Sequence, residues 1–168
     1  MKILIDADAC PGVVKEMLYK ISHRLNMELV FVANQYMKFP STSLISSIIV
    51  KAGPDEADNH IVEIVQAGDL VITEDIPLAD RVVKKDAVVL TPRGKLLTED
   101  NIGQKLAVRN LMTDLRNEGI MTGGPGAFGN KEKQLFANAI DKLLTKALRK
   151  IEMEKKKAKM HGHTPQRD

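Results

Sequence analysis

Short apolar runs alternate with amphipathic stretches along this chain, and that alternation most restricts its fold. Between the runs, residues 12–25, the segment from Asp55 to Gly68 and residues 77–84 repeat apolar side chains at helical spacing. The runs have the length of buried strands: residues 3–5, 28–32, 48–50, 70–72 and 87–90. Such alternation indicates a mostly parallel sheet with right-handed crossovers. We predict an α/β fold, a single-domain three-layer sandwich around five strands.

The length and composition fit one soluble globular domain. A chain of 168 residues can bury a sizeable core, and 43% hydrophobic with 28% charged residues is ordinary for soluble proteins. The last predicted helix runs from about residue 131 to beyond Ile151, after which apolar periodicity stops and lysines dominate. We therefore predict a domain over residues 1–151 and a basic, disordered tail over residues 152–168.

A longer helix is predicted before that last one. Thr98 is suited to its start and Gly119 to its end. Its apolar residues fall on one face: Ile102, Leu106, Leu111 and Leu115. The glycine-rich residues 121–130 are predicted to form a loop.

We expect a cytoplasmic protein. No apolar run approaches transmembrane length, and no signal peptide precedes Met1. The single cysteine, Cys10, excludes an intrachain disulfide. A thiol at a helix start can be a nucleophile, but the neighbouring carboxylates oppose its ionisation. We therefore predict that Cys10 is a small buried residue.

Acidic residues follow three of the predicted strands. Asp6 and Asp8 come after the first strand, Asp55 and Asp58 after the third, and Asp75 after the fourth. If the strand order is 3-2-1-4-5, strands one and four are neighbours at the switch point, where open α/β sheets bind ligands. All five carboxylates would then lie at the carboxyl edge of the sheet. The alternative is that each acid, Asp8 in particular, only stabilises the start of the following helix.

Carboxylates that converge without lysine or arginine partners repel one another. A hard divalent cation held by oxygen ligands relieves that repulsion, and such an ion can promote phosphodiester cleavage. The predicted ligands of Mg²⁺ or Mn²⁺ are the five acids named above: Asp6, Asp8, Asp55, Asp58 and Asp75. Of these, we predict Asp6, Asp58 and Asp75 to be catalytic.

Several short motifs occur in a characteristic order along the chain: DADACP, ANQ, DxADN, GDLVITxDIPLA, PRG and TGGP. Over roughly residues 1–150 the chain resembles the YaiI/YqxD family of uncharacterised bacterial proteins. The resemblance implies a PIN-like domain, and members of that superfamily are often metal-dependent ribonucleases. The resemblance implies that Asp6 and Asp75 correspond to the acidic residues that follow strands one and four in PIN-like domains. Asp55 and Asp58 are similar to the acidic residues that these domains carry in mid-chain, at the start of a helix. The uncharged residues 126–130 depart from the basic loop expected there.

A nucleic-acid substrate requires cations that meet its phosphates. Arg93 and Lys95 follow the fifth predicted strand, and the Thr73 hydroxyl could bind a phosphate or orient a ligand carboxylate. We predict these three residues to contact RNA or another single strand. The aromatic rings of Tyr36 and Phe39 could stack on bases.

Two rival functions fit parts of the same pattern. A strand followed by Asp-x-Asp also opens phosphatases of the haloacid dehalogenase type, with Asp6 as nucleophile and Asp8 as general acid. Cys10 stands where that family usually has threonine or valine, which counts against it. The second rival is a non-catalytic PIN-like module that binds RNA or another protein.

Overall fold

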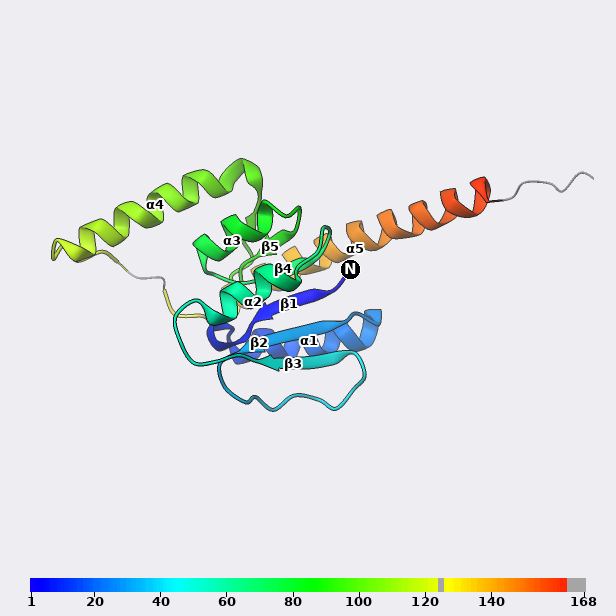
Figure 1. The fold of residues 1–168 in the computed structure, drawn as a ribbon, viewed down its shortest axis with the longest axis horizontal. Coiled ribbons are helices and arrows are strands. Elements are labelled where there is room, and N and C mark those ends of the chain that lie inside the picture. The colour runs from blue at the N-terminus through cyan, green and yellow to red at the C-terminus, as the bar shows by residue number, and fades with distance from the viewer. Residues whose placement is uncertain (124–125, 163–168) are drawn as a thin grey trace, which may run out of the picture.

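The computed structural model describes residues 1–123 and 126–162, and it contains one twisted sheet (Figure 1). Its strand order is β3-β2-β1-β4-β5-β6, and the first five strands are parallel. The strands are β1 (Ile3–Asp6), β2 (Leu29–Ala33), β3 (Ile45–Ile49), β4 (Leu70–Ile72), β5 (Val88–Leu90) and β6 (Leu96–Leu97). The predicted α/β class and the order of the first five strands are confirmed.

Strand β6 was not predicted from the sequence. It pairs antiparallel with β5, and the turn between them brings Gly94 against helix α5 (Asn130–His161). The φ angle of Gly94 is +86°, and a Cβ atom there would lie 2.6 Å from the backbone carbon of Leu135. Only glycine fits this position, because both the backbone conformation and the contact exclude a side chain.

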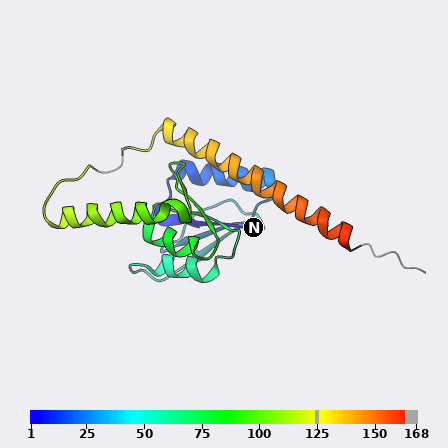
Figure 2. The ribbon, with the colours of Figure 1, turned by 90° about the horizontal axis from the view of Figure 1, so that it is seen from above.

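Helices cover both faces of the sheet, which confirms the three-layer sandwich (Figure 2). On one face, α1 (Gly12–Leu25) and α5 pack on alternate strand residues such as Ile3 and Ile5. On the other face, α2 (Glu56–Ile64) and α3 (Ile76–Val83) pack on residues such as Leu4. Both cores are aliphatic, and the fully buried aromatic rings are those of Phe31 and Phe136.

Helix α4 (Glu99–Asn117) projects from the body (Figures 1 and 2). Thr98 is its N-cap, as the sequence indicated, and the Thr98 backbone N–H donates to Asn101 Oδ1 over 2.9 Å. Of the predicted apolar face, Ile102 is buried, whereas Leu111 is 55% exposed. Only the start of α4, which lies over α3, therefore contributes to the core.

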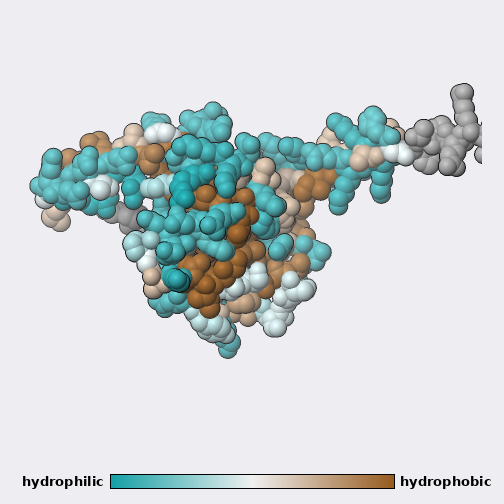
Figure 3. Space-filling view, in the orientation of Figure 1, coloured by the Kyte–Doolittle hydropathy of each residue, from teal (hydrophilic) through white to brown (hydrophobic). Residues whose placement is uncertain are grey.

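Helix α5 continues to His161, through the Lys-rich segment for which the sequence predicted a disordered tail from residue 152. Lysine, glutamate, alanine and methionine are good helix formers, and an established helix propagates through them without core contacts. The projecting end of α5 is mainly hydrophilic, while hydrophobic side chains gather over β2 and β3 (Figure 3). Residues 163–168 of the predicted tail lie outside the described residues.

None of the helices in the described part of the chain combines the length and apolar character that a membrane crossing requires.

Candidate functional site

Asp6 and Thr73 meet at the carboxyl edge of the sheet. Strands β1 and β4 pair in parallel with Ile5 opposite Ile72, so the next residue of each strand comes to the same place. The Thr73 hydroxyl donates a hydrogen bond to Asp6 Oδ2 over 3.1 Å. Thr73 is buried, and its oxygen also accepts from the Asp75 backbone N–H over 3.0 Å. The predicted role of Thr73 in orienting a carboxylate thus has a structural basis in the free protein.

Asp75 is held at the start of α3. Its Oδ1 accepts a hydrogen bond from the Leu78 backbone N–H over 3.0 Å, which makes it the N-cap of that helix. Pro77 stands in the first turn, where its missing N–H has no helical partner to lose. The capping role and the site role that the sequence left as alternatives are therefore compatible in this residue.

Asp58 completes a group of three carboxylates with Asp6 and Asp75. It lies in the first turn of α2, and its pKa is raised from 3.8 to about 6. Burial is the largest cause, followed by the negative charges of Asp75, Asp6 and Asp55, and a hydrogen bond to Asp75 adds to the shift. Burial and the neighbouring negative charges both disfavour the ionised form of Asp58.

The pKa of Asp6 is also raised. Burial is the main cause, the hydrogen bond from Thr73 opposes it, and the charges of Asp75 and Asp8 add to the rise. None of the ion pairs formed within the described residues involves Asp6, Asp58 or Asp75. We call these three carboxylates the acidic site; the sequence predicted their convergence, and the structure brings them together.

Asp8 and Asp55 lie at the margin of the acidic site. Asp8 is exposed, and its Oδ2 accepts from the Asn34 backbone N–H over 2.7 Å. It does not cap α1, whose N-cap is Pro11 without a side-chain hydrogen bond. Asp55 is exposed and has a left-handed backbone (φ 67°) ahead of α2. Both residues influence the acidic site through charge.

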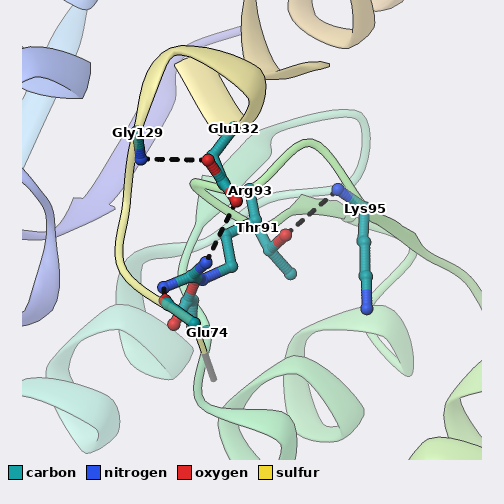
Figure 4. Close-up of polar contacts among 7 residues, drawn as sticks. Glu74, Thr91, Arg93, Lys95, Gly129 and Glu132 are labelled. Carbon is teal, nitrogen blue, oxygen red and sulfur yellow. Dashed lines mark hydrogen bonds and ion pairs between the residues drawn. The ribbon is translucent and has the colours of Figure 1, made fainter. Parts of the chain in front are cut away.

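Arg93 is occupied by contacts within the protein (Figure 4). Its Nη2 donates to the carbonyl oxygen of Gly126 over 2.6 Å, and its guanidinium lies 5.8 Å from the centre of the Phe128 ring. Its Nε lies 3.3 Å from Glu74 Oε1, and its Nη1 lies 3.9 Å from Glu132 Oε1. Arg93 therefore ties the β5–β6 turn to the start of α5, a role that the sequence did not indicate.

Lys95 differs from Arg93 although two residues separate them. Its backbone N–H bonds to the Thr91 hydroxyl, and its side chain points away from the cluster around Arg93 (Figure 4). Lys95 is exposed, and its ammonium group makes no ion pair within the described residues. Of the two predicted phosphate contacts, Lys95 has the accessible charge.

Cys10 fits the structural role predicted for it. It is buried, and burial raises the pKa of its thiol to about 12. The nearby charges of Asp6 and Glu74 add to that rise, while Lys15 opposes it. The thiol therefore stays protonated at neutral pH and is a poor nucleophile.

The fold and the acidic site define a class of protein: a parallel α/β domain with uncompensated carboxylates at the carboxyl edge of its sheet. The chain belongs to the uncharacterized YaiI/YqxD family, whose sequence profile matches residues 4–146.

Three relatives illustrate how far the similarity extends. A UPF0178 protein of Maridesulfovibrio salexigens is 55% identical over 151 residues, which are 90% of this chain and 100% of the relative. A UPF0178 protein of Citrifermentans bemidjiense is 53% identical over 89% of this chain and 97% of its own length. One of Trichlorobacter lovleyi is 49% identical over 92% of this chain and 100% of the relative. No solved structure matches the chain significantly.

Proposed function

We propose that this protein is a PIN-like, divalent-metal-dependent nuclease that hydrolyses phosphodiester bonds in RNA or single-stranded DNA. One observation carries the proposal: Asp6, Asp58 and Asp75 converge without a cationic partner, and the pKa of Asp58 is raised to about 6. A group of carboxylates that repel one another in the free protein gains the most from a bound cation. The strand order from β3 to β5 agrees with the PIN-like arrangement expected from the sequence.

The donor chemistry of the acidic site fits a hard cation. Carboxylate oxygens are the ligands that Mg²⁺ and Mn²⁺ prefer, and the proposed ligands are Asp6, Asp58 and Asp75. Within residues 1–123 and 126–162, no three His, Cys, Asp or Glu side chains are already arranged around a common ion position. Binding would therefore involve rotation of these carboxylates, and it would be weakened below about pH 6, where Asp58 takes up a proton. When bound, the ion would activate water and stabilise negative charge on the phosphate.

Cleavage assays test the proposal. Labelled RNA and DNA strands are incubated with the protein and Mn²⁺, beside Asp6→Asn, Asp75→Asn and the control Asp114→Asn, which changes an exposed carboxylate on the remote helix α4. We expect cleavage by the wild type and the control, and a loss of about 100-fold or more in the two site variants. Cleavage undiminished in both site variants would overturn the mechanism.

Metal binding is measured separately from cleavage. Mn²⁺ that binds only the folded state raises its melting temperature in a concentration-dependent way. We expect such a rise in the wild type and in Asp114→Asn, and none in Asp6→Asn. A rise of equal size in all three proteins would contradict a site at Asp6.

The second candidate function is a non-catalytic PIN-like module that binds nucleic acid or another protein. The absence of a preformed three-carboxylate arrangement within the described residues favours it. Nucleic-acid binding without cleavage in Mn²⁺ or Mg²⁺ would support this alternative. Release of phosphate from a small monoester, with an aspartyl-phosphate on Asp6, would instead indicate the phosphatase.

A further inference from the structure

A pocket opens at the carboxyl ends of β1 and β2, beside the acidic site. Its volume is about 350 Å³, and we call it the Tyr36 pocket after the exposed aromatic ring in its lining. The volume is in the range of small-ligand sites. The lining residues with polar or aromatic groups are Asp8, Lys15, Asn34, Gln35 and Tyr36. Of the residues to which the sequence analysis gave a function, Asp8 and Tyr36 lie in this lining.

The pocket adjoins the acidic site through β1. Ala7 lines the pocket and directly follows Asp6 in the chain. Asp8 also lines it, and the charge of Asp8 acts on Asp6. A ligand in the Tyr36 pocket would therefore extend naturally toward Asp6.

Asn34 carries an unused hydrogen-bond acceptor in this lining. Its backbone N–H donates to Asp8 Oδ2 over 2.7 Å, which fixes the loop after β2 against the end of β1. Its side-chain oxygen is buried and has no hydrogen-bond partner within the described residues. A buried acceptor without a donor is unfavourable, and a ligand that donates a hydrogen bond would remove this cost.

Tyr36 and Lys15 offer two further kinds of contact. The Tyr36 side chain is 80% exposed, whereas the ring of Tyr19 packs on Phe31 at 5.7 Å. An exposed ring at the mouth of a pocket suits stacking on a planar heterocycle. Lys15, in the first turn of α1, is half-buried and adds one positive charge to the lining, which suits a phosphate.

We propose that the Tyr36 pocket binds one base of a single-stranded nucleic acid, stacked on Tyr36, whose exocyclic amino group donates to Asn34 and Asp8. Cytosine, adenine and guanine carry such an amino group, whereas uracil and thymine do not. The pocket thus distinguishes bases that have an exocyclic amino group from bases that lack one. It also places the adjoining phosphate between Lys15 and the acidic site. That placement rests on the proposed nuclease function, whereas base binding by itself does not.

Binding is measured without divalent cations, so that no cleavage occurs. Fluorescence anisotropy follows labelled short oligocytidine and oligouridine, each as RNA and as the DNA counterpart, with unlabelled cytidine monophosphate as competitor. We expect oligocytidine to bind more tightly than oligouridine, and Asn34→Leu to abolish that preference. Competition by the mononucleotide at concentrations close to those of the strand would identify a free nucleotide as the ligand in place of a strand.

Substitution of the exposed ring tests stacking without risk to the core. We expect Tyr36→Ala to weaken binding about tenfold, the loss that corresponds to one base stacked on an aromatic ring. Tyr36→Phe keeps the ring and should retain the wild-type affinity. The chain has two tyrosines and no tryptophan, so the ring-proton NMR signals of Tyr36 and Tyr19 can be told apart. We expect the Tyr36 signals to shift on binding and the Tyr19 signals to stay unchanged.

Two results would overturn the inference. One is equal affinity of the wild type for oligocytidine and oligouridine, and the other is unchanged binding by Tyr36→Ala. Base-selective binding without cleavage would leave the Tyr36 pocket in place and refute the nuclease. Cleavage that is indifferent to the base and to Tyr36 would refute the pocket and leave the nuclease.

Discussion

The two edges of the sheet carry buried or half-buried aspartates in opposite circumstances. At the amino edge, Asp69 is 3% exposed and lies 2.7 Å from the ammonium group of Lys2. It also accepts hydrogen bonds from the backbone N–H groups of Lys2 and Gln66 at 3.1 and 2.9 Å. At the carboxyl edge, Asp6 receives one hydrogen bond, from Thr73, and no ion pair within the described residues.

This difference separates a structural carboxylate from one that is available to a ligand. Asp69 joins the start of β1 to the turn before β4, and its charge is satisfied by the protein itself. The acidic site retains mutual repulsion, which raises the pKa of Asp58 and Asp6. Uncompensated charge of this kind costs stability and is typical of functional sites.

Arg93 shows that the carboxyl edge does not lack cations altogether. Its guanidinium neutralises Glu74 and Glu132, which are not members of the acidic site. The charge on Arg93 also lowers the pKa of Glu132, although hydrogen bonds from the backbone at the start of α5 are the larger causes. The charge of Arg93 is thus already used by Glu74 and Glu132.

The largest effect on stability is expected at the amino edge. Asp69→Asn leaves the charge of Lys2 partly buried without a partner, and we expect a loss of about 3 kcal/mol in the free energy of unfolding. Urea denaturation at neutral pH measures it. The double variant Lys2→Met, Asp69→Asn should recover part of the loss. A loss below about 1 kcal/mol in the single variant would remove the contrast between the two edges.

Arg93 should give an intermediate effect. Arg93→Ala removes the contacts to Gly126, Glu74 and Glu132, and we expect a loss of about 1–2 kcal/mol. Lys95→Ala is the matched control, because its exposed side chain should contribute within about 0.5 kcal/mol. Urea denaturation measures the free energy of unfolding of both variants, and equal stability of the two would contradict the structural role of Arg93.

Asp58 should act in the opposite direction to Asp69. Its pKa in the folded protein is about 6 against an ordinary value of 3.8, so the folded state binds the proton more tightly than the unfolded chain. Its contribution to stability therefore falls as pH rises from about 4 to about 6 and stays low above that range. After allowance for partial exposure to solvent, Asp58→Asn should stabilise the protein at pH 7 by about 1 kcal/mol.

Thermal unfolding from pH 4 to pH 8 checks this prediction. The gain from Asp58→Asn should be absent at pH 4, where the wild-type carboxyl is protonated, and should reach its full size near pH 7. A variant that is less stable than the wild type at pH 7 would show that Asp58 is compensated by the protein, as Asp69 is.

The smallest change in stability is expected for Asp75→Asn. Asparagine is as good an N-cap as aspartate, so the hydrogen bond to the Leu78 N–H can persist and α3 should keep its start. We expect a difference within about 0.5 kcal/mol by urea denaturation. Asp75→Ala removes the cap and should cost about 1 kcal/mol. A large loss in the asparagine variant would mean that the charge of Asp75 is itself structural.

Local pattern was sufficient for much of the fold and for the position of the acidic site. The apolar run from Ile3 to Ile5 and the capping residues of α3 act over a few positions, and their structures followed from their sequence. Parallel alternation then placed Asp6 and Asp75 at one edge, because both follow neighbouring strands. The two-residue strand β6 lacks such a pattern, since it is defined by its pairing with β5.

The sequence by itself determined the alternating elements and the edge at which the acids gather, because short-range periodicity defines the elements and the crossovers make their strands parallel. The strand order 3-2-1-4-5 was a hypothesis from the sequence, and the structure confirms it. Only the tertiary structure decided which charges are neutralised. Lys2 and Asp69, or Arg93 and Glu132, lie far apart in the chain and meet only after folding. The side-chain oxygen of Asn34, a residue of the Tyr36 pocket, is likewise buried without a partner only as a result of the tertiary structure. Burial and partnership depend on the whole packed chain, and they separate Asp69, whose charge the protein neutralises, from the carboxylates of the acidic site, which form no ion pair within the described residues.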